Sequence, residues 1–457
     1  MTLPSEFLAR MRALLLEEFP DFLAVYGQES EHALRVNTVK TDKDTLLSLL
    51  PFTPTPLPFG EGLYRIPPGE RAGTHPLHHA GAYYMQDPSA MATVSALPFR
   101  IDGWRVLDMC AAPGGKSGQL AALVGPSGQL YSNEIVPSRA RILLGNAERL
   151  GLCNTAILST DPQTLGAFFD RYFDLTVVDA PCSGEGMFRK YPEAADEWSP
   201  AGVEAAAARS RLILAEAAKT VAEGGYLLYS TCTFAEEENE ETVTTFLASH
   251  PDFAIAPVSP EVCAVTAPGI LRAGRPADIT LTRRYYPHKA PGEGQYLALL
   301  QRVSGGRGDV TFRQTPTRIE KKAEATLRAH LADLLDPAAV MQLTVTGDTV
   351  LSVPADMPLP PRGLVRAGVA LGSMSGKLFL PHHHAAGALG RHFLRTLPLS
   401  LDDPRLAAYL LGEEIAADGA PAGFAAVTVA GIPLGLVKCS GGRAKNHYPK
   451  GLRVSRA

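Results

Sequence analysis

The sequence predicts an α/β protein in which a doubly wound parallel sheet stands between a small N-terminal domain and a β-rich C-terminal region. Two observations predict this class. Strand-like and helix-like segments alternate from residue 104 to residue 233, and a glycine-rich turn follows the first strand. Repeated strand-helix units of this length are typical of a parallel sheet with helices on both faces. The predicted domains are residues 1–95, 96–303 and 304–457.

The elements of the predicted core follow one another with short connections. Pro137 marks the start of one helix, and Gly224-Gly225 is predicted to end the longest one. A late strand at 295–300 completes the sheet. In order, the core segments are a strand at 104–109, a helix at 117–125, a strand at 129–135, a helix at 137–152, strands at 154–161 and 174–184, a helix at 205–222 and a strand at 226–233.

The segments on either side of the core have different patterns. Residues 1–20 have the spacing of an amphipathic helix and lack the apolar core and cleavage site of a signal peptide. Residues 301–316 are predicted to be a linker, and residues 321–335 a helix. Most of 340–457 consists of short apolar segments broken by glycine and proline, which indicates a β-rich region.

Composition limits the class of protein. Hydrophobic residues make up 46% and charged residues 20% of 457, and the formal net charge is −4, so a basic nucleic-acid coat protein is disfavoured. No apolar run approaches the roughly 18 residues of a membrane span, and the predicted compartment is the cytoplasm. The six cysteines contain no CxxC pair, so we predict reduced thiols and no zinc site.

The glycine-rich turn, DMCAAPGGKSGQ at 108–119, has the order strand, turn and helix that places a ligand at a helix N-terminus. ATP is disfavoured because a phosphate-binding loop needs glycine where Cys110 stands. A nicotinamide cofactor is disfavoured because the GxGxxG pattern is missing. Two interpretations remain: S-adenosylmethionine, whose amino-acid end the loop backbone can hold, and an ordinary turn without a ligand.

Three acidic residues end the second, third and fourth predicted strands. Glu134 lies 24 residues after Cys110, a distance that suits a carboxylate accepting from ribose hydroxyls. Asp161 is placed to accept from an adenine amino group, and Asp179 ends the next strand. Because ligands of open α/β sheets bind beyond the carboxyl ends of the strands, the three acids together favour a nucleoside-containing cofactor over three unrelated caps.

Two cysteines, Cys182 and Cys232, follow the fourth and fifth predicted strands. One such cysteine is more often a small buried apolar residue, but two in equivalent positions indicate chemistry. A thiolate there can act as a covalent nucleophile if cations lower the pKa of the thiol, and Arg189 and Lys190 are the candidates. The glutamates within 236–241 are interpreted as capping and solvating the following helix, and no metal site is predicted.

Three motifs resemble those of the NSUN-type (Nop/Sun) RNA cytosine-5 methyltransferases: DMCAAPGGKSGQ (108–119), VVDAPCSGEGMFRKYPE (177–193) and YSTCTFAEEENE (229–240). The resemblance implies a Rossmann-like class I methyltransferase core with S-adenosylmethionine as cofactor. It also implies the cofactor-binding residues, which are Cys110, Ala111, Ala112, Pro113, Gly114, Gly115, Lys116, Glu134, Arg139, Asp161 and Asp179.

The resemblance covers nearly the whole chain. LRVNTVKT (34–41), HPLHHAGAYYMQDPSA (75–90) and YYPHKAPGEGQYLALL (285–300) look like flanking segments of the same family. GLVRAGVALG (363–372) and KNHYPKGLRV (445–454) are most similar to the bacterial RsmF-like branch. That branch methylates small-subunit ribosomal RNA and ends in a PUA-like RNA-binding region.

The resemblance also implies catalytic roles. Carbon 5 of cytosine is a poor nucleophile, and thiolate attack at carbon 6 activates it toward a methyl donor. DNA cytosine-5 enzymes use a cysteine in a Pro-Cys context, which would favour Cys182, whereas the RNA family uses the cysteine of the later Thr-Cys-Thr motif. The family match therefore implies Cys232 as the nucleophile, Cys182 in adduct release and Asp179 in positioning the base.

Cations gather near the C-terminus and around 271–289. A stretch of cations without acids supports phosphate contacts that weaken as salt rises, although a solvated basic tail has the same composition. The predicted RNA contacts are Arg189, Lys190, Lys438, Arg443, Lys445, Lys450 and Arg453.

The function predicted from these patterns is methylation of carbon 5 of cytosine in small-subunit (16S) ribosomal RNA by a monomer that acts on rRNA or the 30S subunit, not on DNA or membranes. A transfer RNA cytosine-5 methyltransferase is one alternative. A non-catalytic ribosome-assembly factor that binds RNA is the other, and the intact Cys182 and Cys232 argue against it.

Overall fold

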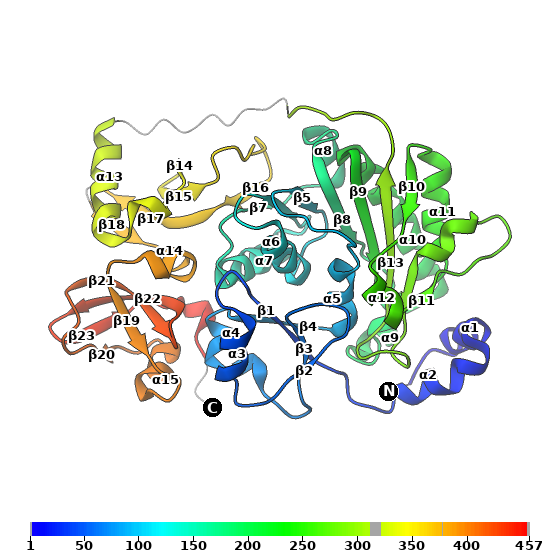
Figure 1. Cartoon of the computed structure of the whole chain (residues 1–457), viewed down its shortest axis with the longest axis horizontal. Coiled ribbons are helices and arrows are strands. Elements are labelled where there is room, and N and C mark those ends of the chain that lie inside the picture. Colours follow the sequence, from blue (N-terminus) through cyan, green and yellow to red (C-terminus); the bar gives the residue numbers. More distant parts are fainter. Residues whose placement is uncertain (1, 311–320, 377, 455–457) are drawn as a thin grey trace.

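The computed structural model describes residues 2–310, 321–376 and 378–454. In Figure 1 the core sheet, with its helices, lies beside the C-terminal region, and the small N-terminal sheet lies below the core. The division of the chain at residues 95 and 303 stays a prediction.

The N-terminal unit contains a four-stranded antiparallel sheet in the order β2-β3-β1-β4. Asp42 caps α3 and Asp87 caps α5, since each carboxylate accepts from backbone N–H groups of the first helical turn. The bounds are β1 (Ala33–Val36), α3 (Lys43–Leu49), β2 (Thr55–Pro56), β3 (Leu63–Arg65), α4 (Pro76–His79), β4 (Tyr83–Gln86) and α5 (Pro88–Ser95).

Two helices precede that sheet, α1 (Ser5–Leu15) and α2 (Phe19–Val25). The single helix predicted for residues 1–20 is therefore interrupted after Leu15, where Leu16 has a φ of 50°, and helical structure continues to Val25. Phe7 and Phe22 are fully buried, but their partners belong to the core. The ring of Phe7 lies 5.0 Å from that of Phe188, and the ring of Phe22 lies 5.4 Å from that of Phe234. The helices therefore pack against the two segments that carry the predicted catalytic cysteines.

The core sheet confirms the predicted doubly wound arrangement. Its central strands are parallel in the order β7-β6-β5-β8-β9, and β13 (Gln295–Arg302) adds antiparallel to β9. All carboxyl ends of the parallel strands therefore meet at one edge. The bounds are β5 (Arg105–Asp108), α6 (Gly115–Val124), β6 (Gln129–Asn133), α7 (Pro137–Leu150), β7 (Thr155–Leu158), α8 (Pro162–Phe168), β8 (Phe173–Asp179), α10 (Pro200–Thr220), β9 (Val221–Thr231) and α11 (Glu240–Ser249).

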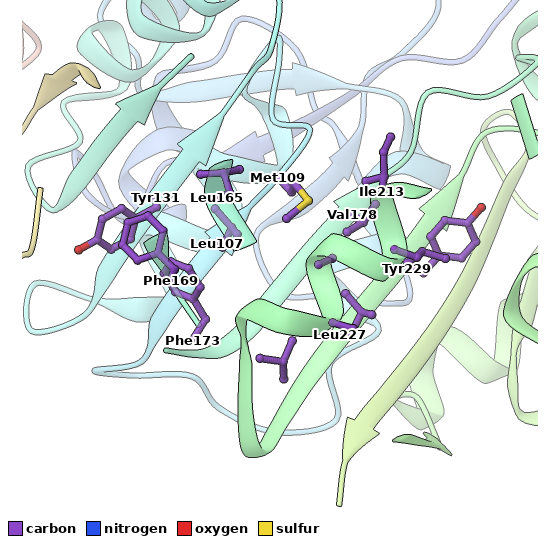
Figure 2. Packing of buried hydrophobic residues seen from close by; sticks show 14 of the residues in the cluster. Leu107, Met109, Tyr131, Leu165, Phe169, Phe173, Val178, Ile213, Leu227 and Tyr229 are labelled. Carbon is purple, nitrogen blue, oxygen red and sulfur yellow. The ribbon is translucent and has the colours of Figure 1, made fainter. Parts of the chain in front are cut away.

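Successive side chains of these strands alternate between two apolar layers, as the period of a strand requires. Leu107, Val178 and Leu227 pack with residues of α8 and α10 on one face, the cluster drawn in Figure 2. Their chain neighbours, such as Val106 and Leu228, pack with α6 and α7 on the other face. Each such side chain contributes roughly 1.5–3 kcal/mol when fully buried, so the sheet edge that holds the site is rigidly supported.

The predicted end of the longest helix is wrong. Helix α10 ends at Thr220, and Gly224 and Gly225 lie inside β9, where Gly224 has a φ of 76°. Val221 is fully buried and pairs with Phe173 of β8, and the register of the pairing shifts just after it. The glycines therefore lie where the strand pairing is irregular, and the positive φ of Gly224 makes that irregularity possible. Val221 and Ala222 are buried in the sheet, which favours a strand over a continued helix.

The C-terminal region begins with α13 (Lys321–Leu334), which confirms the predicted helix, and continues as two small sheets. Residues 311–316 of the predicted linker lie outside the described residues. The bounds are β14 (Gln342–Thr346), β15 (Thr349–Val353), β17 (Val369–Ser375), β18 (Leu378–Pro381) and α14 (His383–Leu389), then β19 (Thr396–Leu399), α15 (Pro404–Leu411), β20 (Ile415–Ala416), β21 (Gly423–Val429), β22 (Ile432–Ser440) and β23 (Arg443–Asn446).

One strand of this region joins the core sheet. Strand β16 (Leu364–Ala367) pairs antiparallel with β7, so the core sheet ends on a strand from the C-terminal part of the chain. Arg366 of this strand forms an ion pair of 3.0 Å with Glu148 of α7. The C-terminal region is thus fixed to the catalytic core by backbone hydrogen bonds and by charge.

The remaining core elements lie toward the other end of the sheet: α9 (Pro192–Glu197), β10 (Phe253–Ala256), α12 (Pro260–Val265), β11 (Ala267–Pro268) and β12 (Arg283–Tyr285). Within 2–310, 321–376 and 378–454, no helix combines the length and apolar character that crossing a membrane requires. In the same ranges, histidine, cysteine and acidic side chains form no group of three that could hold a metal ion.

Candidate functional site

The glycine-rich turn joins β5 to α6 at the carboxyl edge of the core sheet. Residues 110–113 form the turn, Gly114 adopts a φ of 112°, and α6 begins at Gly115. A Cβ at Gly115 would lie 2.9 Å from the side chain of Gln86 and 3.0 Å from that of Tyr84. Strand β4 of the N-terminal unit therefore packs directly against the start of α6, and a side chain at Gly115 would clash with it.

A cavity of about 260 Å³ opens between this turn and the N-terminal unit. It is lined by Asp179 and by residues within 84–90, 108–116 and 187–191. Three buried oxygens that belong to lining residues, Gln86 Oε1, Asp87 Oδ2 and Asp108 Oδ1, have no hydrogen-bond partner in the described part of the chain. Buried polar atoms normally have partners, so these oxygens favour a ligand that brings hydrogen-bond donors.

Asp108 is fully buried at the end of β5. Ser117 donates a hydrogen bond of 2.6 Å to Asp108 Oδ2, which leaves Oδ1 for a ligand. Burial, with the negative charge of Asp179 added, raises the pKa of Asp108 to about 7. An ammonium group in the cavity would stabilise the ionised carboxylate. The amino-acid end of the predicted cofactor has such a group, and the residues present therefore fit it.

The other predicted cofactor acids lie along the same edge. Glu134 is buried after β6, where it accepts from the Val136 N–H at 2.9 Å and forms an ion pair of 3.1 Å with Arg139. Arg139 also donates to the carbonyl oxygen of Ala112 in the turn. Glu134 and Arg139 are thus brought together beside the loop.

Asp161 serves as the N-cap of α8. Its two carboxylate oxygens accept from the Thr164 N–H and hydroxyl, each at 2.8 Å, and these hydrogen bonds lower the pKa of Asp161. The carboxylate is therefore ionised at neutral pH and held in one orientation. Oxygens of a carboxylate keep further lone pairs after one bond each, so this cap can still accept from a ligand.

Asp179 and Lys116 form an ion pair at the centre of the edge. Lys116 Nζ lies 2.8 Å from Asp179 Oδ2, while Ser230 and Gln295 donate to Asp179 Oδ1. Burial disfavours the charged form of Lys116, but the Asp179 carboxylate outweighs it, and the pKa of Lys116 is raised. The glycine-rich loop thus supplies a permanent cation to the acid that ends β8.

The two predicted catalytic cysteines are brought together. Cys182 Sγ lies 3.2 Å from Cys232 Sγ, and the Cys232 N–H donates to Cys182 Sγ at 3.3 Å. The hydrogen bond to Cys232 and burial raise the pKa of Cys182, so its thiol keeps the proton at neutral pH. Both side chains are partly exposed.

The interpretation of the glutamate run after Cys232 is wrong for two of its members. Glu238 and Glu240 are fully buried rather than solvated. Glu238 accepts from the Ser183 N–H and shares a second hydrogen bond with the Ser183 hydroxyl, beside Cys182, and Glu240 forms a buried ion pair with Arg284. Glu236 is 16% exposed and pairs with Arg272, which is exposed, and with Arg275, which is buried. Glu238 therefore contacts the loop of Cys182, while Glu236 and Glu240 form ion pairs with arginines of the segment 271–289.

The cations predicted to touch RNA divide into two groups. Arg189 is 6% exposed and forms an ion pair of 2.9 Å with Glu293, so the structure does not present it to RNA. In the segment 271–289, Arg272, Arg275 and Arg284 are held by the glutamates already described, and Lys289 pairs with Glu18. The tertiary structure thus uses these cations to join elements.

Lys190 and the C-terminal cations are more accessible. Lys190 lines the cavity. Lys438 and Lys445 are exposed and lie opposite each other on β22 and β23, and Lys450 is exposed. Arg443 is exposed but pairs with Glu414, and Arg453 donates to the Tyr448 carbonyl oxygen. A pair of exposed lysines on adjacent strands is thus the most accessible of these predicted contacts.

Several residues of the site were not predicted individually. Gln86 and Tyr84 line the cavity from the N-terminal unit, and the segment 75–90 resembled the family without indicating their role. Met187 and Tyr191 line it beside Lys190. Asp108 opens the glycine-rich motif, and a carboxylate before a ligand-binding turn was the available signal.

Comparison with known proteins gives matches along the chain. The family model described as 16S rRNA methyltransferase RsmB/F matches residues 97–301. The model for the N-terminal domain of 16S rRNA methyltransferase RsmF matches residues 3–88, and that for the methyltransferase RsmF PUA domain matches residues 396–454.

Full-length relatives and a solved structure agree with these matches. The chain is 31% identical to ribosomal RNA small subunit methyltransferase F of Klebsiella pneumoniae and 32% identical to that of Cronobacter sakazakii, in each case over 98% of this chain and 96% of the relative. The crystal structure of NSun6 from Pyrococcus horikoshii with SFG has a TM-score of 0.57 at 22% identity, and the match covers 66% of this chain and 99% of that one. The likeness to NSun6 is one of fold, and the predicted class I methyltransferase core with a C-terminal PUA domain is confirmed.

Proposed function

The chain belongs to the RsmF family of 16S rRNA methyltransferases, and on this basis we propose that it methylates carbon 5 of cytosine in small-subunit ribosomal RNA through a covalent cysteine adduct. The membership confirms the predicted enzyme class, an RNA methyltransferase. The proposal adds two points to the family membership: the methyl group goes to carbon 5, and a cysteine forms a covalent bond to the base.

The observation that carries the proposal is the pair of thiols at the sheet edge. Cys182 and Cys232 lie with their sulfurs 3.2 Å apart, after the strand that ends in Asp179 and the strand next to it. One sulfur can form a bond to the base while the other acts on the same adduct. A sulfur that is bonded to carbon 6 cannot act a second time on the same adduct, so the neighbouring thiol has a role left to fill.

Cys232 is the nucleophile and Cys182 the residue that assists release. Cys182 holds its proton, whereas the resemblance to the RNA family places the attacking cysteine in the Thr-Cys-Thr motif, which is Cys232. Cys232 Sγ bonds to carbon 6 of cytosine, and the electron pair of the ring double bond moves to carbon 5. Carbon 5 then accepts the methyl group that the cofactor, when bound, would supply. A water molecule takes the carbon 5 proton, the pair of that C–H bond re-forms the ring double bond, and the sulfur–carbon bond breaks with its electron pair returning to Cys232. The protonated Cys182 assists by donating a hydrogen bond to the departing Cys232 sulfur. Asp179 positions the base during these steps.

S-adenosylmethionine, when bound, supplies the electrophilic methyl group. Residues 110–116 hold its amino-acid end, and the unpartnered Asp108 Oδ1 accepts from its ammonium. Glu134 and Asp161 accept hydrogen bonds from its nucleoside part, and Arg139 keeps Glu134 oriented. Gln86 and Tyr84 would bound the cofactor cavity from the side of the N-terminal unit.

The RNA substrate contacts the accessible cations. Lys190 faces the cavity, and Lys438, Lys445 and Lys450 extend the positive surface over the PUA domain. Ribosomal RNA is the substrate that the relatives' names give for them. If the target base is paired, it must leave the helix at a cost of a few kcal/mol.

Two substitutions test the chemistry. We expect Cys232→Ala to abolish methylation without forming an RNA adduct, because no sulfur then attacks carbon 6. Cys182→Ala is expected to accumulate a covalent RNA adduct that survives denaturing gel electrophoresis, because release is impaired. A Cys232→Ala protein that still trapped RNA, beside a Cys182→Ala protein that did not, would reverse the two roles. Cys153→Ala, a cysteine remote from the site, is the matched control.

A comparison of acceptors tests the substrate. Purified 30S subunits, naked 16S rRNA and transfer RNA are offered with radiolabelled S-adenosylmethionine, and modified cytosines are mapped by bisulfite sequencing. We expect label in 16S rRNA, free or assembled. Label in transfer RNA alone would favour the transfer RNA alternative.

A further inference from the structure

Behind the two thiols, a chain of side-chain hydrogen bonds connects the loop of Cys182 to the loop of Cys232. The Ser183 hydroxyl lies within hydrogen-bonding distance of Glu238 Oε1, at 2.5 Å, and of Thr233 Oγ1, at 2.8 Å. Thr233 Oγ1 lies 3.0 Å from Glu185 Oε2. Ser183 follows Cys182 in the sequence, and Thr233 follows Cys232. These hydrogen bonds therefore hold each cysteine in place through the residue that follows it.

The ends of the chain are well defined by backbone and indole donors. Glu238 Oε2 accepts from the Ser183 N–H at 2.9 Å. Glu185 accepts from the Phe234 N–H at 3.0 Å and from Trp198 Nε1 at 3.1 Å. Burial raises the pKa of Glu185, and its three donors and the positive charge of Arg10 oppose that rise. Because Glu185 has donors from three residues, whereas the hydrogen bonds of the Glu238 carboxyl group are to Ser183, Glu185 is the stronger acceptor of the two.

The two carboxyl groups at the ends of this network must share one proton. If Glu238 and Glu185 are both ionised, Ser183 donates to Glu238, Thr233 donates to Glu185, and the 2.8 Å contact between the two hydroxyls has no proton. A proton on either carboxyl group gives every contact one proton. Glu238 is the favoured holder, because Glu185 then keeps all three of its donors, which are Thr233, the Phe234 N–H and Trp198 Nε1.

The surroundings of Glu238 also favour its neutral form. Its side chain is fully buried, and burial, with the negative charge of Glu185 added, raises the pKa of Glu238 to about 7. The other titratable groups around it are Cys182 on the preceding loop, Tyr229 of β9, whose hydroxyl donates to the Glu238 carbonyl oxygen, and Arg211 of α10. Arg10 of α1 pairs with the neighbouring Glu237 rather than with Glu238.

We propose that Glu238 is a positioning residue which, as a neutral carboxylic acid, holds the Cys182 loop against the Cys232 loop. The inference rests on the proposed function, since it assigns a role toward the same two thiols. When Glu238 loses its proton, Ser183 donates to Glu238 instead of to Thr233, so the hydrogen bond between Ser183 and Thr233 is lost and the two loops can separate. Because the second thiol acts on the adduct only at close range, release of the adduct is the step that suffers.

Two substitutions of Glu238 separate its roles. The glutamine in Glu238→Gln can donate to Ser183 Oγ and accept from the Ser183 N–H, as the neutral acid does, whereas Glu238→Ala can do neither. We expect Glu238→Gln to keep methylation within about threefold of wild type at pH 6. Glu238→Ala is expected to lose at least tenfold and to accumulate RNA adduct. Glu241→Gln, an exposed neighbour, is the control and stays at the wild-type rate.

The pH profile gives the decisive measurement. The ratio of the wild-type rate to the Glu238→Gln rate is expected to fall about tenfold between pH 6 and pH 8, because only wild type loses the proton. A flat ratio, or a Glu238→Gln protein as impaired as Glu238→Ala, would overturn the proposal. Each variant is first checked for wild-type thermal unfolding and S-adenosylmethionine binding. Cys232→Ala run in parallel tests the proposed function separately, since full activity in that variant would refute the adduct itself.

Discussion

The cysteine loops and the joint between the three units of the chain are both built from buried polar side chains, but with different partners. Behind the cysteines, carboxyl groups and hydroxyls of two loops bond to one another. At the joint, which we define as Arg35, Asn37 and Lys40, side chains donate to backbone carbonyl oxygens of other units. The first region joins two loops of the site to each other, and the second joins the units of the chain.

The joint is the part of the LRVNTVKT segment to which the resemblance assigned no role. Arg35 donates to the carbonyl oxygens of Gly115 and Gly118 in α6, at 3.4 and 3.3 Å. Asn37 donates to those of Gly81 and Leu150, each at 2.8 Å.

Lys40 completes the joint by donating to Ala80 O at 2.6 Å and to Pro433 O of β22 at 3.2 Å. The N-terminal unit is thus tied to the cofactor loop, the catalytic core and the PUA domain through three side chains.

The difference has a consequence for stability as a function of pH. Burial lowers the pKa of Lys40 to about 7, with the positive charge of Arg149 adding to the effect, and burial raises that of Glu238 to about 7. Between pH 7 and 10.5 the unfolded chain binds a proton at Lys40 that the folded chain does not, so stability rises with pH. Between pH 4.5 and 7 the folded chain binds the extra proton at Glu238, so stability falls as pH rises.

The largest expected effect comes from breaking the joint at Asn37. Asn37→Ala leaves two buried carbonyl oxygens without this donor, at a cost of about 3 kcal/mol in unfolding free energy. Urea unfolding measures this loss, and exposed Thr38→Ala is the control. We expect the folded Asn37→Ala protein to keep its methylation rate at saturating substrates within about twofold. An unchanged urea midpoint would show that the joint does not hold the units together.

The next effect concerns Lys40, and the quantity measured is how the unfolding free energy changes with pH. The wild-type protein is expected to gain about 2 kcal/mol more unfolding free energy between pH 7 and pH 9 than Lys40→Met, because Lys40 is already neutral in the folded state. Lys43→Met, whose lysine is exposed beside Glu61, is the matched control and should retain the wild-type gain. Equal gains in wild type and Lys40→Met would mean that the buried Lys40 keeps its proton above neutrality.

The smallest effect separates buried cations from exposed ones. Lys438→Ala and Lys445→Ala are each expected to lower the slope of log affinity for RNA against log salt by about 0.7–0.9, the value for one phosphate contact. Lys40→Met should leave the slope unchanged, since the Lys40 side chain is 4% exposed. Fluorescence anisotropy with a 16S rRNA fragment from 50 to 300 mM salt measures the slope. A slope that Lys438→Ala and Lys445→Ala leave at the wild-type value would remove these lysines from the RNA interface.

The strands, the glycine-rich turn and the acids at strand ends could be predicted because their signals are local. A strand alternates with period two, a turn needs glycine at Gly114, and Asp179 follows the apolar run of β8 directly. The same locality explains the failures. Gly224-Gly225 has the composition of a helix end, but Val221 is buried against β8 and continues the sheet instead.

The charged residues show what local reasoning misses. Arg189 and the cations within 271–289 have the composition of an RNA surface, yet most are held by glutamates distant in the sequence. Glu238 belongs to a run of glutamates before a helix, a pattern typical of solvated capping residues, yet its side chain is buried behind the cysteines. A charge in the sequence has no partner until the fold brings one, and its role changes with that partner.

The order of the core elements, the glycine-rich turn and the two cysteines can be read from the amino-acid sequence, because their signals come from neighbours along the chain. The 3.2 Å distance between the two sulfurs, the place of β16 at the end of the core sheet and the hydrogen bond from Lys40 to β22 come from the folded structure alone. These contacts join residues far apart in the chain. Their free energy comes from burial and from partners that no local pattern contains.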